Sequence, residues 1–273
     1  MPRNLALLLA FLSLGFLLLA AVSAPERRTV EAAAAAFASP LELPPLGADE
    51  RGRPLTDYAM QGAHIVAVPA LLAGLLVTFL GTVGGLVRCM GSERVESLVS
   101  GFREVVGALP RMVVLLVVAM LMPLEWRSLL ALALVWALLA APGAMDEAAS
   151  VAGRLGGARF VEALRAHGFS RLRIYLFHVV ALNLRPVVVR QGAETLMQVV
   201  FLEVALSYLA LAAGEPSFTH NEAVTKSWAD LLYQGYQAIA MDVPSTHVLV
   251  LGLALVAVTA LAAVSISSAA RAR

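Results

Sequence analysis

Polar and ionisable side chains interrupt one otherwise apolar stretch, residues 186–213. Arg190, Gln191, Glu194 and Gln198 fall within about 100° of one another on a helical wheel, so one helix face would carry all four. Arg190 and Glu194 are four residues apart and can form an ion pair. Because such groups are costly in a membrane helix unless they face protein or water, the stripe predicts a bundle interior or a solute pathway. For Arg190 the alternative is an ion pair near the cytoplasmic end, with its side chain reaching toward the headgroups.

Glu203 lies on a different side of the same predicted helix. An ionised carboxylate at the centre of a bilayer costs about 2.5–3.5 kcal/mol, so we expect Glu203 to face protein or water rather than lipid. Glu194, Gln198 and Glu203 are the residues that we expect along a translocation pathway. An intramembrane enzyme that uses Glu203 or His178 is an alternative, although no spacing of catalytic groups in the sequence demands one.

Motifs for ATP hydrolysis, metal binding and disulfide formation are absent from the sequence. Lys226-Ser227 lacks the glycine that ends a phosphate-binding loop, so we expect no ATP hydrolysis and no bound cofactor in this chain. The five histidines show no metal-ligand spacing, and Cys89 is the only cysteine, which excludes an internal disulfide. We therefore predict no catalytic residues and no metal site.

The composition is that of a membrane protein. Of the 273 residues, 60% are hydrophobic and 14% are charged, and several apolar runs approach the length that spans a bilayer. We expect an all-α, polytopic helical membrane protein of about six transmembrane helices. The formal net charge of +1 gives no indication of nucleic-acid binding.

The expected spans follow from the apolar runs, and their orientation follows from charge. Arginines gather in residues 88–111, in residues 154–190 and at the two ends, which predicts N and C termini in the cytoplasm. The first run is either a signal peptide cleaved after Val22-Ser23-Ala24 or a retained span, and its length favours retention. The six expected spans are Leu5–Val22, Ile65–Val87, Val105–Pro123, Leu129–Met145, Pro186–Ala213 and Val248–Ile266.

This organisation divides the chain into two parts. Residues 1–62 would hold the first helix and an extracytoplasmic segment, and residues 63–273 would form a transmembrane domain. That domain would contain a cytoplasmic loop at about residues 146–185. The outer segment Gly214–Pro244 either contacts a soluble partner or simply connects two spans.

The cytoplasmic loop has the pattern of two short helices around a glycine. Glu162-Ala163 begins an amphipathic helix, and Gly168 ends it because glycine adopts backbone conformations that other residues avoid. Ser170 is a plausible N-cap of the second helix. One face of that helix would carry Leu172, Tyr175, Leu176 and Val179.

This arrangement resembles the EAA loop in the permease subunits of ABC importers. Glu162, Ala163 and Gly168 hold the places of that pattern, and Leu164 replaces its second alanine. His178 and Asn183 stand where the peptide/nickel branch of the family has His and Asn. Ala181 replaces the proline of that branch, which changes the expected end of the second helix.

Two further stretches resemble the C-type permease of dipeptide, oligopeptide and nickel importers. Residues 46–64 are similar to the segment before its second span, although Pro54, Asp57 and His64 depart from that pattern. The matching positions are Leu46, Gly47, Asp49, Gly52, Arg53, Leu55, Gly62 and Ala63. Residues 203–209 are similar to the family's Glu-Ala-Ser-Leu-Ser-Phe-Leu stretch, and Trp228 matches its Ser-Trp.

The resemblance implies a permease subunit, multi-pass in the cell inner (plasma) membrane, that moves peptides or a related small solute such as a nickel chelate or glutathione. Its implied partners are a second permease subunit, two ATPase subunits that bind the ATP, and an extracytoplasmic solute-binding protein. The implied ATPase-coupling residues are Glu162, Ala163, Gly168, Ser170 and His178. The alternatives are a permease of the same branch that acts in export or antimicrobial-peptide resistance, and a membrane scaffold without transport activity.

Overall fold

A computed structural model describes residues 3–24, 36–90, 93–123, 126, 128–156, 159–170, 173–213, 227–243 and 245–271. Within these ranges the chain is mostly helical, except that residues 36–54 form turns, and its one β-type pairing is an isolated bridge between Ala48 and Pro54. The helices are α1 (Arg3–Val22), α2 (Leu55–Met90), α3 (Glu93–Gly107), α4 (Arg111–Leu121), α5 (Leu129–Gly156), α6 (Arg159–Ala166), η3 (Ile174–Leu184), α8 (Arg185–Ala213), α9 (Trp228–Ala240) and α10 (Thr246–Arg271).

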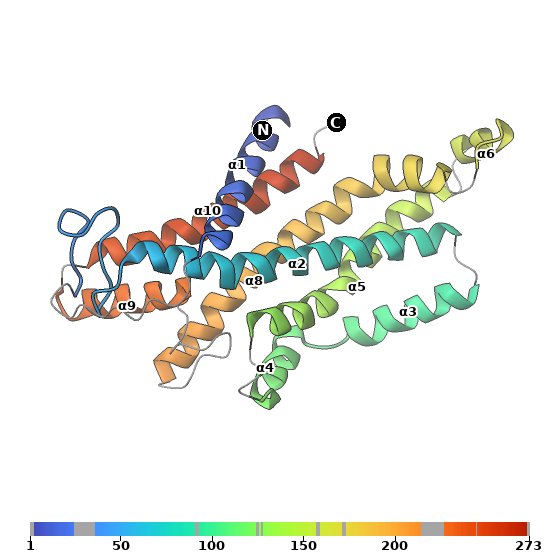
Figure 1. Cartoon of the computed structure of the whole chain (residues 1–273). Helices are drawn as coiled ribbons and strands as arrows, with labels where there is room; N and C mark the ends of the chain where they lie inside the picture. The colour runs from blue at the N-terminus through green and yellow to red at the C-terminus, as the bar shows by residue number, and fades with distance from the viewer. Residues whose placement is uncertain are drawn as a thin grey trace.

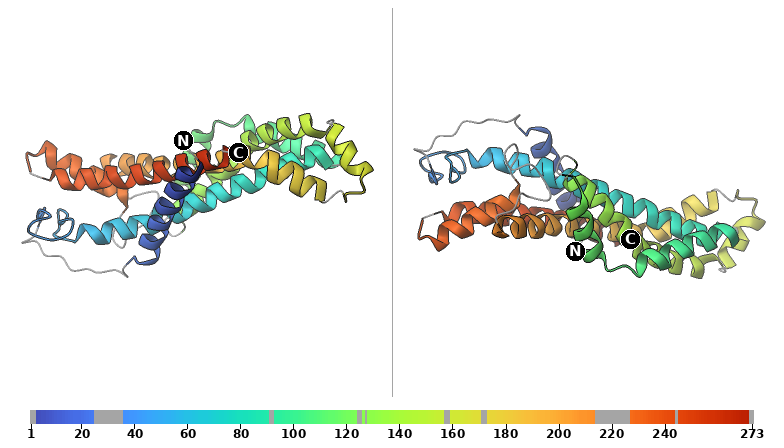
Figure 2. Two further views of the ribbon diagram at one scale, coloured as in Figure 1. Left: turned by 90° about the horizontal axis from the view of Figure 1, so that it is seen from above. Right: turned by 90° about the horizontal axis from the view of Figure 1, so that it is seen from below.

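The molecule is elongated, and α2, α5 and α8 run along its length (Figure 1). Residues 36–54 and α9 lie at one end, and α6 lies at the other, in all of the views (Figures 1 and 2). The start of α1 and the end of α10 lie near each other, and the two helices pack together.

Four of the described helical segments are long and apolar enough to cross a membrane: Asn4–Val22, Leu55–Val87, Leu129–Leu155 and Thr246–Arg271. The bent pair formed by α3 and α4 would be a fifth. Large apolar side chains such as Phe11, Leu75, Phe79 and Val250 are exposed on these helices, as expected of surfaces that face lipid. The prediction of an all-α membrane-embedded fold is confirmed at this level.

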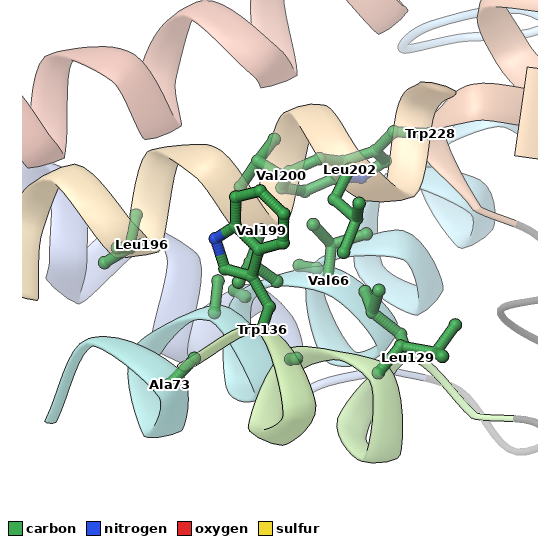
Figure 3. Packing of buried hydrophobic residues seen from close by; sticks show 14 of the residues in the cluster. Val66, Ala73, Leu129, Trp136, Leu196, Val199, Val200, Leu202 and Trp228 are labelled. Carbon is green, nitrogen blue, oxygen red and sulfur yellow. The ribbon is translucent and has the colours of Figure 1, made fainter. Parts of the chain in front are cut away.

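The core lies where α2, α5 and α8 meet. Figure 3 shows Trp136 rising from α5 toward α8, with Val199 beside it and Val66 of α2 nearby. α1 also contributes to this core, because Leu17 is 2% exposed and belongs to the same cluster of buried residues. Helices on both sides of the predicted boundary at residue 62 therefore share one core.

α2 and α8 cross at a pair of glycines. A Cβ at Gly192 would lie 2.0 Å from Thr78 Oγ1 and 2.6 Å from the Gly74 carbonyl oxygen, so only glycine permits this distance between the helices. The Thr78 hydroxyl also donates a 2.8 Å hydrogen bond to the Gly74 carbonyl. This crossing sets how α8 lies against the centre of the bundle.

The predicted third span is wrong as a single helix. Helix α3 ends at Gly107 and α4 begins at Arg111, and their axes differ by 80°. Pro110 is the N-cap of α4 with extended backbone angles (φ −71°, ψ 99°). Proline has no N–H and disfavours the α region for the residue before it, and the chain breaks at Pro110, whereas α2 and α5 continue through Pro69 and Pro142.

Two other helices are longer than the predicted spans. α2 begins at Leu55 rather than at Ile65, so the predicted boundary at residue 62 falls inside a helix. α5 continues to Gly156, well into the predicted cytoplasmic loop. Both extensions are more polar than the apolar runs, and therefore hydropathy alone did not include them.

Buried hydrogen bonds hold together the end of the molecule that carries α9. The Asp49 side chain, which is 0% exposed, accepts hydrogen bonds from the backbone N–H groups of Arg51 and Arg53 and from the Tyr58 hydroxyl. The Tyr58 oxygen in turn accepts a hydrogen bond from the Gln234 amide of α9. These contacts attach residues 36–54 to α2 and α9.

The segment Gly214–Pro244, predicted to lie outside, contains helix α9, one face of which is buried. Ser227 and Asp230 form a capping box at the start of α9. Trp228 is 0% exposed and donates its indole N–H to the Ala59 carbonyl of α2 at 3.3 Å. Trp228 is therefore a core residue, while residues 214–226 lie outside the described part of the chain.

Candidate functional site

The predicted turn at Gly168 closes helix α6 in the way that its sequence indicates. Gly168 has φ +80°, the left-handed conformation that glycine adopts without strain. Its N–H donates to the Arg165 carbonyl at 2.9 Å, and the Phe169 N–H donates to the Leu164 carbonyl at 3.1 Å. These two bonds are those of a Schellman motif, which satisfies the last carbonyls of the helix.

Ser170 has the expected capping geometry. Its hydroxyl accepts a 3.4 Å hydrogen bond from the backbone N–H of Arg173, three residues later, which is the geometry of a helix N-cap. The Ser170 carbonyl also accepts a 3.1 Å bond from the Ile174 N–H. Local sequence therefore determines both ends of this turn.

The helix that follows is a π-helix, so its buried face differs from the predicted one. Ile174, Val179 and Leu184 are buried at every fifth residue, as expected of hydrogen bonds that run from i to i+5. Tyr175 is buried as predicted, but Leu176, which an α-helical period places on the same face, is 49% exposed. Leu172, the fourth residue of the predicted face, lies outside the described residues.

Side chains bind the turn to both helices. The Arg165 guanidinium of α6 donates a 2.7 Å hydrogen bond to the Tyr175 hydroxyl of η3. The Phe169 ring meets the His178 ring edge-on at 6.0 Å between centroids, and the Arg173 guanidinium lies 4.8 Å from the Phe169 centroid. His178 is thus placed against the turn as a packing residue.

A second apolar cluster joins the unit of α6, the Gly168 turn and η3 to the bundle. Tyr175, Val179 and Leu184 of η3 pack with Ala148 and Ala152 near the end of α5. Glu162, Ala163 and Gly168 remain exposed. The unit is therefore held to the membrane helices while it presents an uncovered polar surface, at the far end of the molecule from α9 (Figure 1).

The polar stripe of α8 is joined to α5 through an acid that the sequence analysis did not single out. Glu147 forms an ion pair with Arg190 and accepts a 2.5 Å hydrogen bond from the Gln191 amide. The predicted pair between Arg190 and Glu194 is also present, at 3.8 Å. Glu147 is the second ionisable residue after the apolar run of α5. That position is the feature of the sequence by which it could have been identified.

The two deeper residues of the expected pathway are not equivalent. Gln198 is exposed, and its side-chain oxygen accepts a 3.0 Å hydrogen bond from the indole N–H of Trp136 on α5. Glu203 is 0% exposed, and its carboxylate accepts a 3.1 Å hydrogen bond from Ser207 one turn later. Glu194 and Gln198 therefore share the surface beside α5, whereas Glu203 is enclosed by protein on another side.

The structure thus separates the predicted site residues into two groups. The exposed surface at the Gly168 turn, with Glu162, Ala163 and Ser170, can bind another protein. The stripe on α8 can offer hydrogen-bonding groups and charge to a solute or to a neighbouring helix. Among the residues that the structure describes, no group of three or more His, Cys, Asp or Glu side chains is placed to hold a metal ion.

Comparison with known proteins adds no relative to these observations. No protein-family model matches the chain, and no curated protein matches it.

Proposed function

We propose that this chain is the membrane-embedded permease subunit of an ABC importer of the peptide/nickel branch, in the inner membrane. The observation that carries the proposal is the unit of α6, the Gly168 turn and η3. It has the motif residues Glu162, Ala163 and Gly168 on an exposed surface at the end of the bundle that carries the arginine-rich segments. Packing of η3 against α5 gives that surface a mechanical connection to the membrane helices.

In this proposal the chain makes six membrane passes, with α8 added to the five segments, the bent pair included, that are long and apolar enough to cross a membrane. α2, α3, α5, α8 and α10 alternate in direction along the molecule, and α1 lies obliquely beside α10 (Figure 1). With α6 in the cytoplasm, both termini would also be cytoplasmic, in agreement with the distribution of arginines. Residues 36–54 and α9 would then face outward, where a solute-binding protein would dock.

In this mechanism the ATPase subunits bind and hydrolyse ATP, and their closure moves the surface around Gly168. The motion would pass through η3 to α5 and α8, opening the pathway beside Glu194 and Gln198 first to one side and then to the other. Such coupling requires the surface to bind its partner with different free energy in the two states. The chain purified alone is expected to hydrolyse no ATP.

Two substitutions test this proposal. Both lie on the exposed surface around Glu162 and Gly168, here called the coupling surface. A Cβ at Gly168 would meet no atom within 4 Å, so Gly168→Val acts only through backbone strain of roughly 1–2 kcal/mol at positive φ. Glu162→Lys reverses an exposed charge. Both variants should insert at normal abundance, lose co-purification with the ATPase subunits, and lose solute-stimulated ATP hydrolysis and uptake.

A matched control isolates the backbone effect. Gly101 of α3 also has open space around it but lies in ordinary helix, so Gly101→Val should retain uptake. Gly168→Asn should retain partial function, since asparagine tolerates the left-handed conformation. Normal uptake by both Gly168→Val and Glu162→Lys would show that this loop is only a basic topology anchor.

A further inference from the structure

A cavity outside the site described above lies between α3 and α5. Its volume is about 480 Å³, within the range of small-molecule sites, and it opens to the surface. The polar residues that line it are Glu96, Ser100, Arg103, Asp146, Ser150 and Arg154. The cavity therefore offers two guanidinium groups, two carboxylates and two hydroxyls to one ligand.

The ends of the apolar runs show where the cavity lies along the length of the bundle. Residues 129–145 of α5 contain no charged side chain, and Asp146 is the first one after them. Arg103 of α3 forms an ion pair with Asp146 at this level. On α2, Gly84 lies against Met145, close to the end of the apolar run at Val87. The cavity is thus at the boundary where the apolar zone ends and the polar zone begins.

Helix α3 places this polar cavity beside an apolar surface. Glu96, Ser100 and Arg103 lie on the face toward α5, and no side chain of the helix is buried. Its opposite face carries Val95, Leu98, Phe102 and Val105, all of which are exposed. A ligand that has a polar head and an apolar tail can bind in the cavity while its tail lies along α3.

We propose that this cavity binds the headgroup of a phosphatidylethanolamine molecule. Arg154, with the hydroxyls of Ser100 and Ser150, would bind the phosphate, and Glu96 and Asp146 would accept hydrogen bonds from the primary ammonium. The lining has equal numbers of basic and acidic side chains, which suits a zwitterion better than an anionic lipid. None of the described residues that line the cavity is aromatic, whereas a choline headgroup is recognised by aromatic rings.

The proposal does not depend on transport activity, so it is tested on the purified chain in detergent after lipid removal. Titration with dioleoyl phosphatidylethanolamine, phosphatidylcholine or phosphatidylglycerol, followed by native mass spectrometry, compares the three headgroups on the same acyl chains. We expect phosphatidylethanolamine to bind about tenfold more tightly than either of the others, the effect of one hydrogen bond to a charged group. Equal binding of all three lipids, or tighter binding of phosphatidylglycerol, would overturn the proposal.

Paired variants localise the site. Glu96→Gln and Arg154→Gln should each lower affinity for phosphatidylethanolamine by about tenfold, for the same reason. Glu93→Gln and Arg94→Gln change the same charges on α3 outside the cavity and should leave the affinity unchanged. If a cavity variant fails to fold, the lipid preference of the unmodified protein still decides. Glycylglycine added to the same titration is not expected to displace phosphatidylethanolamine. Displacement would assign the cavity to a soluble zwitterion and refute the lipid proposal.

Discussion

At the scale of single residues, Glu147 is the side chain on which the polar stripe depends. It holds both Arg190 and Gln191 of α8, whereas Glu194 makes only a 3.8 Å ion pair within its own helix. Arg190 thus forms two ion pairs, a close one with Glu147 and a more distant one with Glu194. The closer partner joins two helices, whereas the more distant partner lies on the same helix as Arg190.

This difference gives a prediction about stability and transport. Glu147→Gln should lower the free energy of unfolding by about 1–2 kcal/mol, because it weakens two hydrogen bonds to a charged group whose side chain is 33% exposed. Glu194→Gln, with a side chain 48% exposed, should lower it by less than about 1 kcal/mol. Thermal unfolding in detergent measures both variants.

Uptake is expected to show the reverse order. Glu194→Gln should impair uptake more than stability, because Glu194 is proposed to face the pathway. Equal losses of stability in the two variants would contradict the inequality of the two ion pairs. Normal uptake by Glu194→Gln would remove Glu194 from the pathway.

At the scale of helices, two connections hold α8 and the segment before it in the bundle. One is the π-helix η3, which buries every fifth residue against α5 and continues directly into α8. The other is the crossing of α2 and α8 at Gly74 and Gly192. The first connects the coupling surface to the bundle, and the second fixes the position of α8 within it.

The crossing of α2 and α8 can be tested by adding one methyl group. Gly192→Ala would place a Cβ against Thr78 Oγ1 and the Gly74 carbonyl, so the helices must separate, at a cost of about 1–3 kcal/mol. Gly101→Ala, in open space, should be neutral or slightly stabilising. Thermal unfolding of the two variants gives the comparison.

A double variant separates the two contacts at the crossing. Adding Thr78→Ala to Gly192→Ala should recover only part of the loss, since the Gly74 carbonyl would still lie 2.6 Å from the new Cβ. Full recovery would mean that the Thr78 side chain alone sets the distance between α2 and α8. Unchanged stability of Gly192→Ala would show that the helices do not approach this closely.

At the scale of the whole molecule, the helices form a bundle whose two ends differ. The end with α9 is closed by the buried network of Asp49, Tyr58 and Gln234. The opposite end presents the exposed surface around Gly168. Apolar side chains cover the middle, so the long axis of the bundle is expected to cross the bilayer.

This arrangement predicts which side of the membrane each end occupies. In a Cys89→Ala background, Leu41→Cys should react with a membrane-impermeant maleimide added to intact cells, because Leu41 is 94% exposed near the α9 end. Ala166→Cys, at the end of α6, should react only after the membrane is permeabilised. Labelling of both positions in intact cells would contradict the proposed topology.

The features that could be predicted from the sequence are those that depend on neighbours within one or two helical turns. The positive φ of Gly168, the cap at Ser170, the ion pair between Arg190 and Glu194 and the apolar runs are all of this kind. Backbone sterics, capping and helical period act over a few residues, and these residues are adjacent in the chain. The membrane class and the local form of the coupling turn therefore followed without any knowledge of packing.

The features that only the tertiary structure decided join residues far apart in the chain. Glu147 meets Arg190 43 positions later, Trp136 meets Gln198 62 positions later, and Trp228 packs on Ala59, 169 positions away. The pattern of one helix indicates which face is apolar, but it does not indicate how that helix is rotated and shifted against another. Side-chain packing at contacts such as Gly74–Gly192 sets that rotation and shift, and so decides which polar groups meet.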